Sequence, residues 1–286
     1  MSKVSFFSLI ASFSASTMFG VPLFLTNSSN SLLRIDSATP GTISSNLAIT
    51  GLQAGENLLG IDFRPANGVL YGVGSSNRLY SLNTATGVAT QVGNAGVFTL
   101  SGTFFGVDFN PSVDRLRVTS NTGQNLRVNP DGTTATVTDG PLAYAAGDAN
   151  AGVGPRVVAS AYTNGPGALT TTLFDIDSNL GILATQAPPN SGTLNTVGSL
   201  GVSTTTQVGF DILPLSGVAF ASLTSAASGF SSLYTINLGT GAATLIGAIG
   251  AGQSITGLAA VSDIPEPGTI GMMMVGAVLM LLRHKR

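Results

Sequence analysis

The sequence contains no cysteine and no tryptophan, and its one histidine, His284, lies next to the C-terminal end. The remainder of the chain therefore has no ligands for a Cys/His zinc site or for a histidine-bound haem. It also has no thiol nucleophile and no Ser-His-Asp triad. These absences exclude several large classes of enzyme, and they show that disulfide bonds do not stabilise the fold.

Charge is scarce as well, since charged residues make up only 8% of the 286 residues and the formal net charge is −2. The segment from Val21 to Asp263, called the body below, has seven Arg, twelve Asp or Glu and no Lys, so its net charge is −5. An acidic body without lysine lacks the positive surface that nucleic acid requires, and we expect no nucleic acid partner. With 43% hydrophobic residues, the chain is also too apolar to be disordered.

A short motif that ends in Asp or Asn and is followed by a turn recurs five times in the body. Its copies are Leu32–Asp36, Leu79–Asn83, Asn125–Asn129, Leu173–Asp177 and Leu233–Asn237. Their last residues are 47, 46, 48 and 60 positions apart. A period in the forties that is built of short strands is typical of propeller blades.

Each of the first two repeats contains four segments with the composition of strands. They are Leu32–Ile35, Thr42–Ile49, Leu58–Phe63 and Val69–Gly74, then Leu79–Leu82, Val88–Gly93, Phe104–Phe109 and Arg115–Ser120. We therefore predict an all-β fold, a β-propeller of about five four-stranded blades, with Val21–Leu25 closing the last blade. The additional residues of the fourth repeat, Ala187–Gly201, read as a long loop. Six blades and an open β-solenoid are the alternatives.

A second repeated pattern, Gly-x-Asp, marks the third strand of each repeat. It occurs as Gly60–Pro65 and Gly106–Pro111, with weaker copies at Gly147-Asp148 and Gly209–Ile212. If the blades are equivalent, the carboxylates of Asp62, Asp108, Asp148 and Asp211 lie at equivalent points around the central channel. They could bind a cation or act as general acid and base. We favour a structural role, in which each Asp accepts backbone N–H bonds, because a residue repeated in every blade is usually architectural.

Three other groups are weaker candidates for ligand contacts. Asp175 and Asp177 alternate in a way that suits Ca²⁺, but the segment lacks the glycine and the final acid of an EF-hand, which favours an ordinary turn. The loop Gly147–Gly152 offers oxygen ligands and little else. Arg115, Arg117 and Arg127 could bind an anion or a sugar acid, although pairing with nearby aspartates is the commoner role. We expect no cofactor, with Ca²⁺ as the one ion that the sequence leaves open.

Five longer segments of the body carry a resemblance to a known family, and they are Leu58–Pro65, Asp108–Pro111, Asp114–Val118, Gly123–Asn129 and Gly192–Gly198. On these segments the body resembles an uncharacterised bacterial domain family of unknown function that has propeller-like repeats. The resemblance covers nearly the whole body. It implies a propeller-like fold, but it brings no activity, ligand or site residue with it.

The N-terminal segment 1–20 has the proportions of a secretory signal peptide. Lys3 is followed by an uncharged, mostly apolar run, Val4–Ala15, and then by small residues that suit cleavage. A buried first strand and an uncleaved anchor are the alternatives.

The C-terminal segment 264–286 contains Pro265, Glu266 and Pro267, an apolar run over 270–282 and a basic end. These three parts resemble the PEP-CTERM sorting signal of Gram-negative bacteria. The resemblance implies a short transmembrane helix that anchors the protein in the inner membrane until an exosortase cleaves it near Pro-Glu-Pro. It also implies export through the general secretion machinery to the cell surface or extracellular matrix. A plain membrane anchor is the alternative.

These observations predict an exported, non-enzymatic module that binds polysaccharide or an envelope partner. The missing catalytic His and Cys and the weakly charged body favour this function over catalysis. An extracellular polysaccharide hydrolase or lyase that uses an Asp pair and an Arg in the channel is the first alternative. A structural module that is stabilised by Ca²⁺ is the second.

Overall fold

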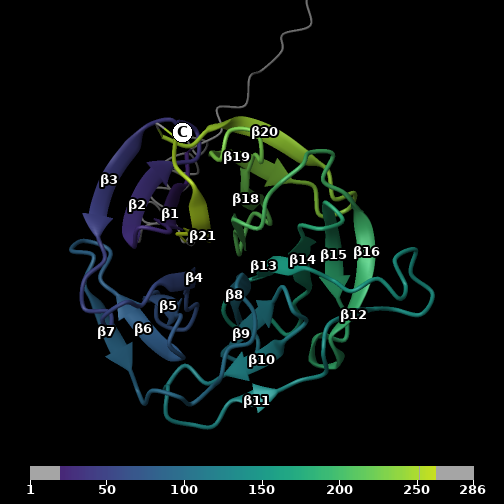
Figure 1. Ribbon diagram of the computed structural model, residues 1–286, viewed down its shortest axis with the longest axis horizontal. Helices are drawn as coiled ribbons and strands as arrows, with labels where there is room; N and C mark the ends of the chain where they lie inside the picture. The colour runs from purple at the N-terminus through teal and green to yellow at the C-terminus, as the bar shows by residue number, and fades with distance from the viewer. Residues whose placement is uncertain (1–19, 251, 262–286) are drawn as a thin grey trace, which may run out of the picture.

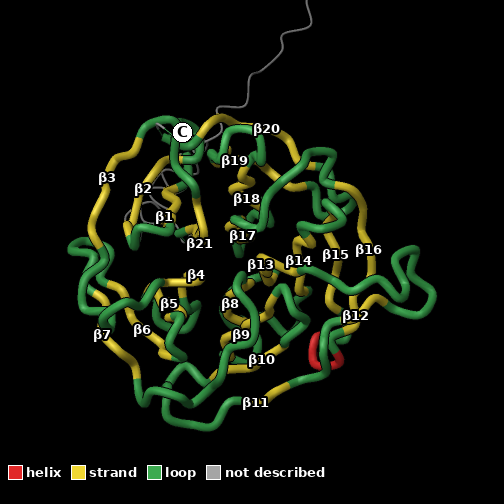
Figure 2. Tube along the Cα trace, viewed as in Figure 1, coloured by secondary structure: helices red, strands yellow, loops and turns green. Residues whose placement is uncertain are grey.

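The computed structural model describes residues 20–250 and 252–261, which form five β-sheets arranged around a central axis (Figure 1). The prediction of an all-β, five-bladed propeller is confirmed. In the described residues the one helical element is a 3-10 turn, η1 (Pro189–Ser191), which is the red segment in Figure 2. The signal peptide, the Pro-Glu-Pro motif and the C-terminal helix that we expected lie outside the described residues. None of the described residues forms a helix with the length and hydrophobicity needed to cross a membrane.

The strands of each blade are given from the inside of the disc to its outer edge. Blade I consists of β4 (Leu58–Phe63), β5 (Leu70–Gly74), β6 (Arg78–Leu82) and β7 (Ala89–Val92). Blade II consists of β8 (Phe105–Asn110), β9 (Arg115–Ser120), β10 (Asn125–Val128) and β11 (Val137–Thr138). Blade III consists of β13 (Val157–Tyr162), β14 (Leu173–Asp177), β15 (Ile182–Gln186), β16 (Thr193–Ser199) and β12 (Ala143–Tyr144). Blade IV consists of β17 (Val208–Ile212), β18 (Ala219–Thr224), β19 (Ser231–Ile236) and β20 (Ala243–Ala248). Blade V consists of β21 (Ile255–Ala260), β1 (Pro22–Asn27), β2 (Ser31–Asp36) and β3 (Ile43–Ala48).

The ring closes in blade V, where the first and last described strands pair. β21 and β1 run antiparallel, with Leu25 opposite Leu258. The expectation that the segment beginning at Val21 would close the last blade is confirmed. Closure of this kind leaves no inner sheet edge exposed, which matters in a chain with few charged residues to protect its edges.

Blade III departs from the predicted repeat. Leu173–Asp177 forms β14, the second strand of this blade, whereas the four other copies of the motif lie in the third strand of their blades. The third strand is β15, which ends at the buried Gln186 instead of at an Asp or Asn turn. The long loop expected over Ala187–Gly201 is wrong as well, because this segment contains η1 and the strand β16. The additional residues lie before β13, in segment 139–156, where β12 adds a fifth strand parallel to β16.

Small residues at one level of the inner strands allow the blades to meet at the axis. Four of the five inner strands have glycine there and β13 has alanine; the residues are Gly60, Gly106, Ala159, Gly209 and Gly257. A Cβ atom at Gly209 would lie 2.6 Å from the backbone nitrogen of Leu258, so a larger residue would push two blades apart. The layer leaves a space of only about 10 Å³ on the axis, so the central channel is closed at this level.

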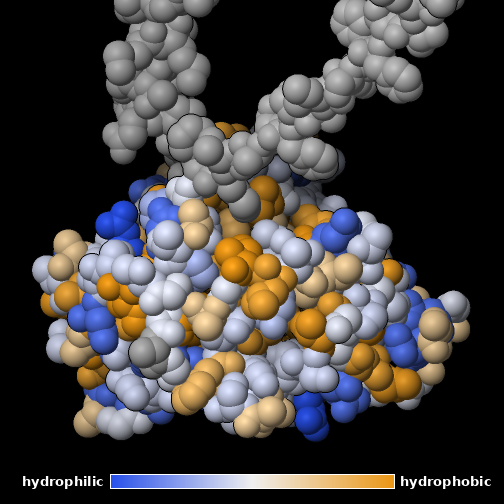
Figure 3. Space-filling model, turned by 90° about the horizontal axis from the view of Figure 1, so that it is seen from above, coloured by the Kyte–Doolittle hydropathy of each residue, from blue (hydrophilic) through white to orange (hydrophobic). Residues whose placement is uncertain are grey.

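The hydrophobic core lies between neighbouring blades, as the flat faces of the sheets pack against each other. Between blades I and II, for example, Tyr71 meets Phe109 edge-on, with ring centroids 5.3 Å apart. The outer edge of the disc is a mixture of hydrophilic and hydrophobic residues in the view of Figure 3. Because hydrophobic clusters lie between the blades all around the ring, the inner strands are packed firmly in place. The side chains that these strands direct toward the axis therefore have fixed positions.

Candidate functional site

Three of the predicted carboxylates meet on the axis of the propeller. Asp62 lies on β4, Asp108 on β8 and Asp211 on β17. An oxygen from each carboxylate lies within 4.8 Å of an oxygen from each of the others. All three residues are buried, with exposed fractions of 6, 4 and 7% in chain order. We call this group the carboxylate cluster.

Each member of the carboxylate cluster also joins its blade to the next one. The backbone N–H that it accepts belongs to the inner strand of the following blade. The donor–acceptor pairs are Phe109 to Asp62 at 2.7 Å, Tyr162 to Asp108 at 3.1 Å and Ala260 to Asp211 at 2.7 Å. The sequence predicted backbone donors for these carboxylates, and the structure adds that the donors come from the neighbouring blade.

The same geometry identifies the equivalent positions in the two remaining blades. The donor residue always follows the aspartate position, so Ala161 in blade III and Ala259 in blade V occupy it. The sequence had assigned the position in blade III to Asp148, which instead lies in the loop before β13. The match failed because β13 has alanine where the other marked strands have Gly or Asp, so the Gly-x-Asp pattern is absent from it.

Burial and mutual repulsion weaken the acidity of the carboxylate cluster. Burial, together with the charge of Asp211, holds the pKa of Asp62 well above its ordinary value of 3.8. Burial, the charge of Asp62 and then that of Asp211 do the same to the pKa of Asp108. Burial raises the pKa of Asp211 to about 7. At neutral pH the cluster is therefore unstable as three bare charges, and it favours either protons or a cation.

The spacing of the carboxylate cluster suits a calcium ion. Calcium binds oxygen ligands at about 2.3–2.6 Å, so two ligands on opposite sides of the ion are about 4.6–5.2 Å apart. The oxygens of the cluster lie no more than 4.8 Å apart, so one ion could reach all three carboxylates. In addition, Asp108 Oδ2 has no hydrogen-bond donor among the described residues, although the side chain is 4% exposed. The cluster offers carboxylate oxygens, which calcium prefers over nitrogen or sulfur ligands.

A cavity of about 590 Å³ opens directly above the carboxylate cluster. Its floor is formed by the three carboxylates, and its walls come from the loops that follow the inner strands. The wall residues combine apolar surface with amide groups and include Phe63, Pro65, Asn67, Asn164, Pro166 and Pro214. A volume of this size is typical of a small-molecule site, and the closed glycine layer makes the cavity a blind pocket.

Arg64 provides the positive charge on the wall of this cavity. Its Nε donates to Asp114 Oδ1 at 2.8 Å, and its Nη2 pairs with the other oxygen of the same carboxylate. The hydrogen bonds from Arg64 lower the pKa of Asp114, and burial, which acts in the opposite direction, offsets only part of this effect. The salt bridge joins the loop after β4 to the loop after β8, so it shapes the rim between blades I and II.

The other predicted acidic residues lie away from the cavity and have structural partners. Although burial opposes the effect, hydrogen bonds from Asn150 and Thr196 lower the pKa of Asp148 and fix its loop against β16. Asp177 is fully buried and accepts the Tyr144 hydroxyl at 2.7 Å. Asp175 is also fully buried, and burial raises its pKa to about 7. In the part of the chain that the structure describes, Asp148, Asp175 and Asp177 therefore do not form a common ligand site.

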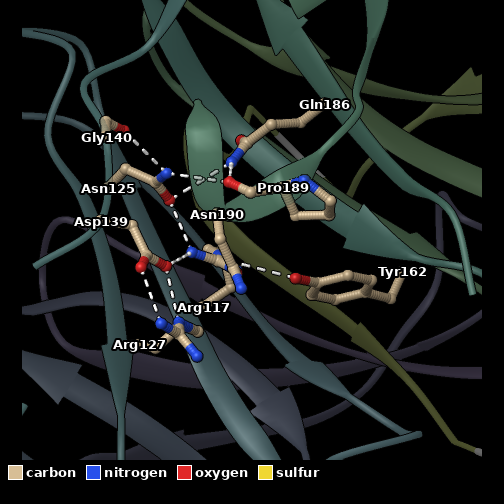
Figure 4. Close-up of polar contacts among 9 residues, drawn as sticks. All are labelled: Arg117, Asn125, Arg127, Asp139, Gly140, Tyr162, Gln186, Pro189 and Asn190. Carbon is tan, nitrogen blue, oxygen red and sulfur yellow. Dashed lines mark hydrogen bonds and ion pairs between the residues drawn. The ribbon is translucent and has the colours of Figure 1, made fainter. Parts of the chain in front are cut away.

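Arg117 lies at the centre of a polar network between blades II and III (Figure 4). Its side chain is 2% exposed, and its Nη1 pairs with Asp139 at 2.6 Å. It donates further hydrogen bonds to Asn125 and Asn190, both at 2.8 Å, and to the Tyr162 hydroxyl at 3.2 Å. Arg117 therefore joins two blades, and the structure gives it the pairing role that the sequence treated as the commoner one.

Several residues of the site were not identified from the sequence. Asn164 and Pro166, which line the cavity, belong to the loop after β13. Arg64 had a detectable signal, because it lies within the first copy of the repeated pattern, Gly60–Pro65. The others come from blade III, whose sequence departs from the repeat.

The comparisons with known proteins identify a family but no activity. The family model "Domain of unknown function (DUF4394)" matches residues 31–259. No curated protein matches the chain. Among solved structures, the chain is similar to dihydro-heme d1 dehydrogenase NirN in complex with DHE, with 12% identity and a TM-score of 0.40. That match covers 78% of this chain and only 43% of the other. Since the family model spans most of the sequence, the chain belongs to the DUF4394 family of domains of unknown function.

Proposed function

We propose that this protein is an exported, non-enzymatic module that binds polysaccharide in the central cavity, with a calcium ion held by the carboxylate cluster. The observation that carries the proposal is the blind cavity of about 590 Å³ whose floor consists of three buried carboxylates. Export is supported by the patterns of segments 1–20 and 264–286, the second of which would be recognised by an exosortase. The exported module would act at the cell surface or in the extracellular matrix.

The walls of the cavity support a carbohydrate ligand. A sugar ring has apolar C–H faces and a rim of hydroxyl groups. Phe63 and the wall prolines offer apolar surface for the faces, and the amides of Asn67 and Asn164 offer hydrogen-bond donors and acceptors for the hydroxyls. A calcium ion on the floor could complete its coordination with sugar hydroxyls, because it prefers six to eight oxygen ligands and the cluster supplies only part of that number.

The constraints on the three carboxylates favour binding over catalysis. Each accepts a backbone N–H from the next blade, so its orientation is tied to the architecture of the ring. The alternative, a polysaccharide hydrolase, is supported by the short separation of the carboxylates and by the raised pKa of Asp211, which suits a general acid. A hydrolase must also place a second, ionised carboxylate or a water molecule beside the sugar. The experiment below separates the two functions.

The test is co-sedimentation of the full chain with the extracellular polysaccharide of its host, in calcium and in EDTA. We expect the protein to sediment with the polymer in calcium, to remain in solution in EDTA, and to release no sugar into the supernatant. The Asp108→Asn variant should bind at least about tenfold more weakly, because it removes one charged ligand of the ion.

The matched control is Asp131→Asn, which changes an exposed aspartate in a turn of blade II and should bind like the natural protein. Release of oligosaccharide would replace the proposal with the hydrolase. Sedimentation that is equal in calcium and EDTA would remove the calcium ion from the account. If the protein does not sediment in either condition, polysaccharide is not its ligand.

A further inference from the structure

A second cavity, of about 360 Å³, lies in the groove between blades II and III. Three guanidinium groups line it, those of Arg115, Arg117 and Arg127, together with the side chains of Tyr162 and Asn190. We call it the guanidinium pocket. None of the three cluster carboxylates lines it, and Tyr162 is the residue that borders both cavities.

The guanidinium pocket has an excess of positive charge in a chain whose body is acidic. Three of the seven arginines of the body line this pocket, and no carboxylate of the described residues does. In the same part of the chain, Asp139 is the carboxylate that forms salt bridges with Arg117 and Arg127. Three guanidinium groups therefore share one salt-bridge partner, whereas the body as a whole is negative.

Two of the three arginines keep hydrogen-bond donors available. Arg127, whose side chain is 31% exposed, donates its Nε and Nη2 to Asp139, and its Nη1 has no acceptor among the described residues. Arg115 donates its Nη1 to the carbonyl oxygens of Val113 and Asp114, and its Nε and Nη2 have no acceptor in that part of the chain. Arg117 is buried beneath them and held by four partners, so it contributes a fixed charge.

We infer that the guanidinium pocket binds the oxyanion of an acidic ligand, and that the ligand is a sugar acid. Arginine matches a carboxylate with two parallel N–H donors, and the arrangement here offers donors from two strands around one fixed charge. Pro189 adds apolar surface that suits a sugar ring, and Asn110 and Asn190 add amides for its hydroxyls. The inference goes beyond the proposed function, because it assigns a different pocket and does not require calcium.

The test is saturation-transfer NMR of the full chain with sodium D-glucuronate, in a buffer that contains EDTA so that the calcium site takes no part. D-glucose has the same ring without the carboxylate, and inorganic sulfate is an oxyanion without the ring. We expect glucuronate to bind, glucose to give no saturation transfer, and sulfate to displace glucuronate. The Arg115→Gln and Arg127→Gln variants should each weaken glucuronate binding by about tenfold, because each removes a charge-assisted donor.

Arg34→Gln is the control, because it removes an exposed arginine from blade V and should bind glucuronate like the natural protein. Arg115→Gln is the variant least able to disturb folding, since its hydrogen bonds go only to backbone carbonyls of its own turn. Unchanged binding in both pocket variants would overturn the inference. Equal binding of glucose and glucuronate would overturn it as well, and sulfate binding without glucuronate binding would overturn the assignment to sugar acids. Because calcium is absent, a failure here is distinct from a failure of the proposed function.

Discussion

The Asp175→Asn variant should lose a large part of the pH dependence of stability that the natural protein shows between about pH 4 and pH 8. Asp175 is fully buried in blade III, its Oδ1 accepts the Ser160 hydroxyl at 2.5 Å, and its Oδ2 has no partner among the described residues. Burial raises its pKa to about 7 from the ordinary value of 3.8. The folded chain therefore keeps a proton that the unfolded chain has already lost.

The sign of the effect follows from this proton. The stability that protonated Asp175 contributes is complete below about pH 4 and is lost as the pH rises through about 7. Over the whole range this amounts to about 4 kcal/mol. An asparagine does not ionise, so the variant should match the natural protein near pH 4 and be more stable near pH 8. Urea unfolding at both pH values measures the difference.

The raised pKa values of the carboxylate cluster also make the stability fall as the pH rises. The effect of Asp175 is therefore measured as the difference between the curves of the natural protein and the variant, and not from the slope of either curve alone. Asp131→Asn, at an exposed turn, should leave the slope of the curve between pH 5 and pH 8 unchanged, because hydrogen bonds from Thr134 and Thr133 lower the pKa of Asp131 and keep it ionised over this range. Parallel curves for the natural protein and Asp175→Asn would contradict the assignment of a buried, protonated carboxyl to Asp175.

The Arg117→Met variant should be destabilised by about 3–5 kcal/mol, because it removes a buried guanidinium whose four hydrogen-bond partners, the buried carboxylate of Asp139 among them, lose a donor that solvent does not replace. These partners include the Tyr162 hydroxyl and two asparagine side chains that link blades II and III. For a domain of this size we expect the melting temperature to fall by roughly 10 °C.

Arg127→Met is the matched control, because Arg127 pairs with the same aspartate but is 31% exposed. Removing this partly solvated pair should cost only about 1 kcal/mol. The double variant Arg117→Met with Asp139→Leu should recover part of the loss, since it leaves no buried charge unpaired. Equal losses in the two single variants would show that Arg117 does not hold the blades together.

The sequence was sufficient to predict most of the architecture, because the blades are local structures. Each hairpin is encoded by its own strand pattern and turn residues, so the eight strands β2 to β9 and the closing strand β1 were predicted correctly, although β11 of blade II was not. Blade III was not, because β15 lacks the Asn or Asp turn and β14 imitates the motif by chance. The fifth strand β12 also has no local signal, since only its pairing with β16 makes it a strand.

The site was predictable only where the repeat itself carried it. Asp62, Asp108 and Asp211 share a pattern, and blade symmetry brings them to the axis. The partners of Arg117 had no such signal, because Asn190 is 73 positions away in the chain and reaches it only when two blades pack. Contacts between blades depend on the ring as a whole and on no local period, which is why the network of Figure 4 was absent from the sequence interpretation.

The measurement that tests the central claim most directly is X-ray diffraction from crystals of the full chain grown in millimolar calcium, with the anomalous signal of calcium recorded. The account predicts one strong peak on the propeller axis, about 2.3–2.6 Å from an oxygen of Asp62, Asp108 and Asp211. The same crystals of Asp108→Asn should show a weaker peak or none. A natural protein with no peak between the three carboxylates, or with calcium only at its surface, would contradict the claim that the central cavity is built around a cation.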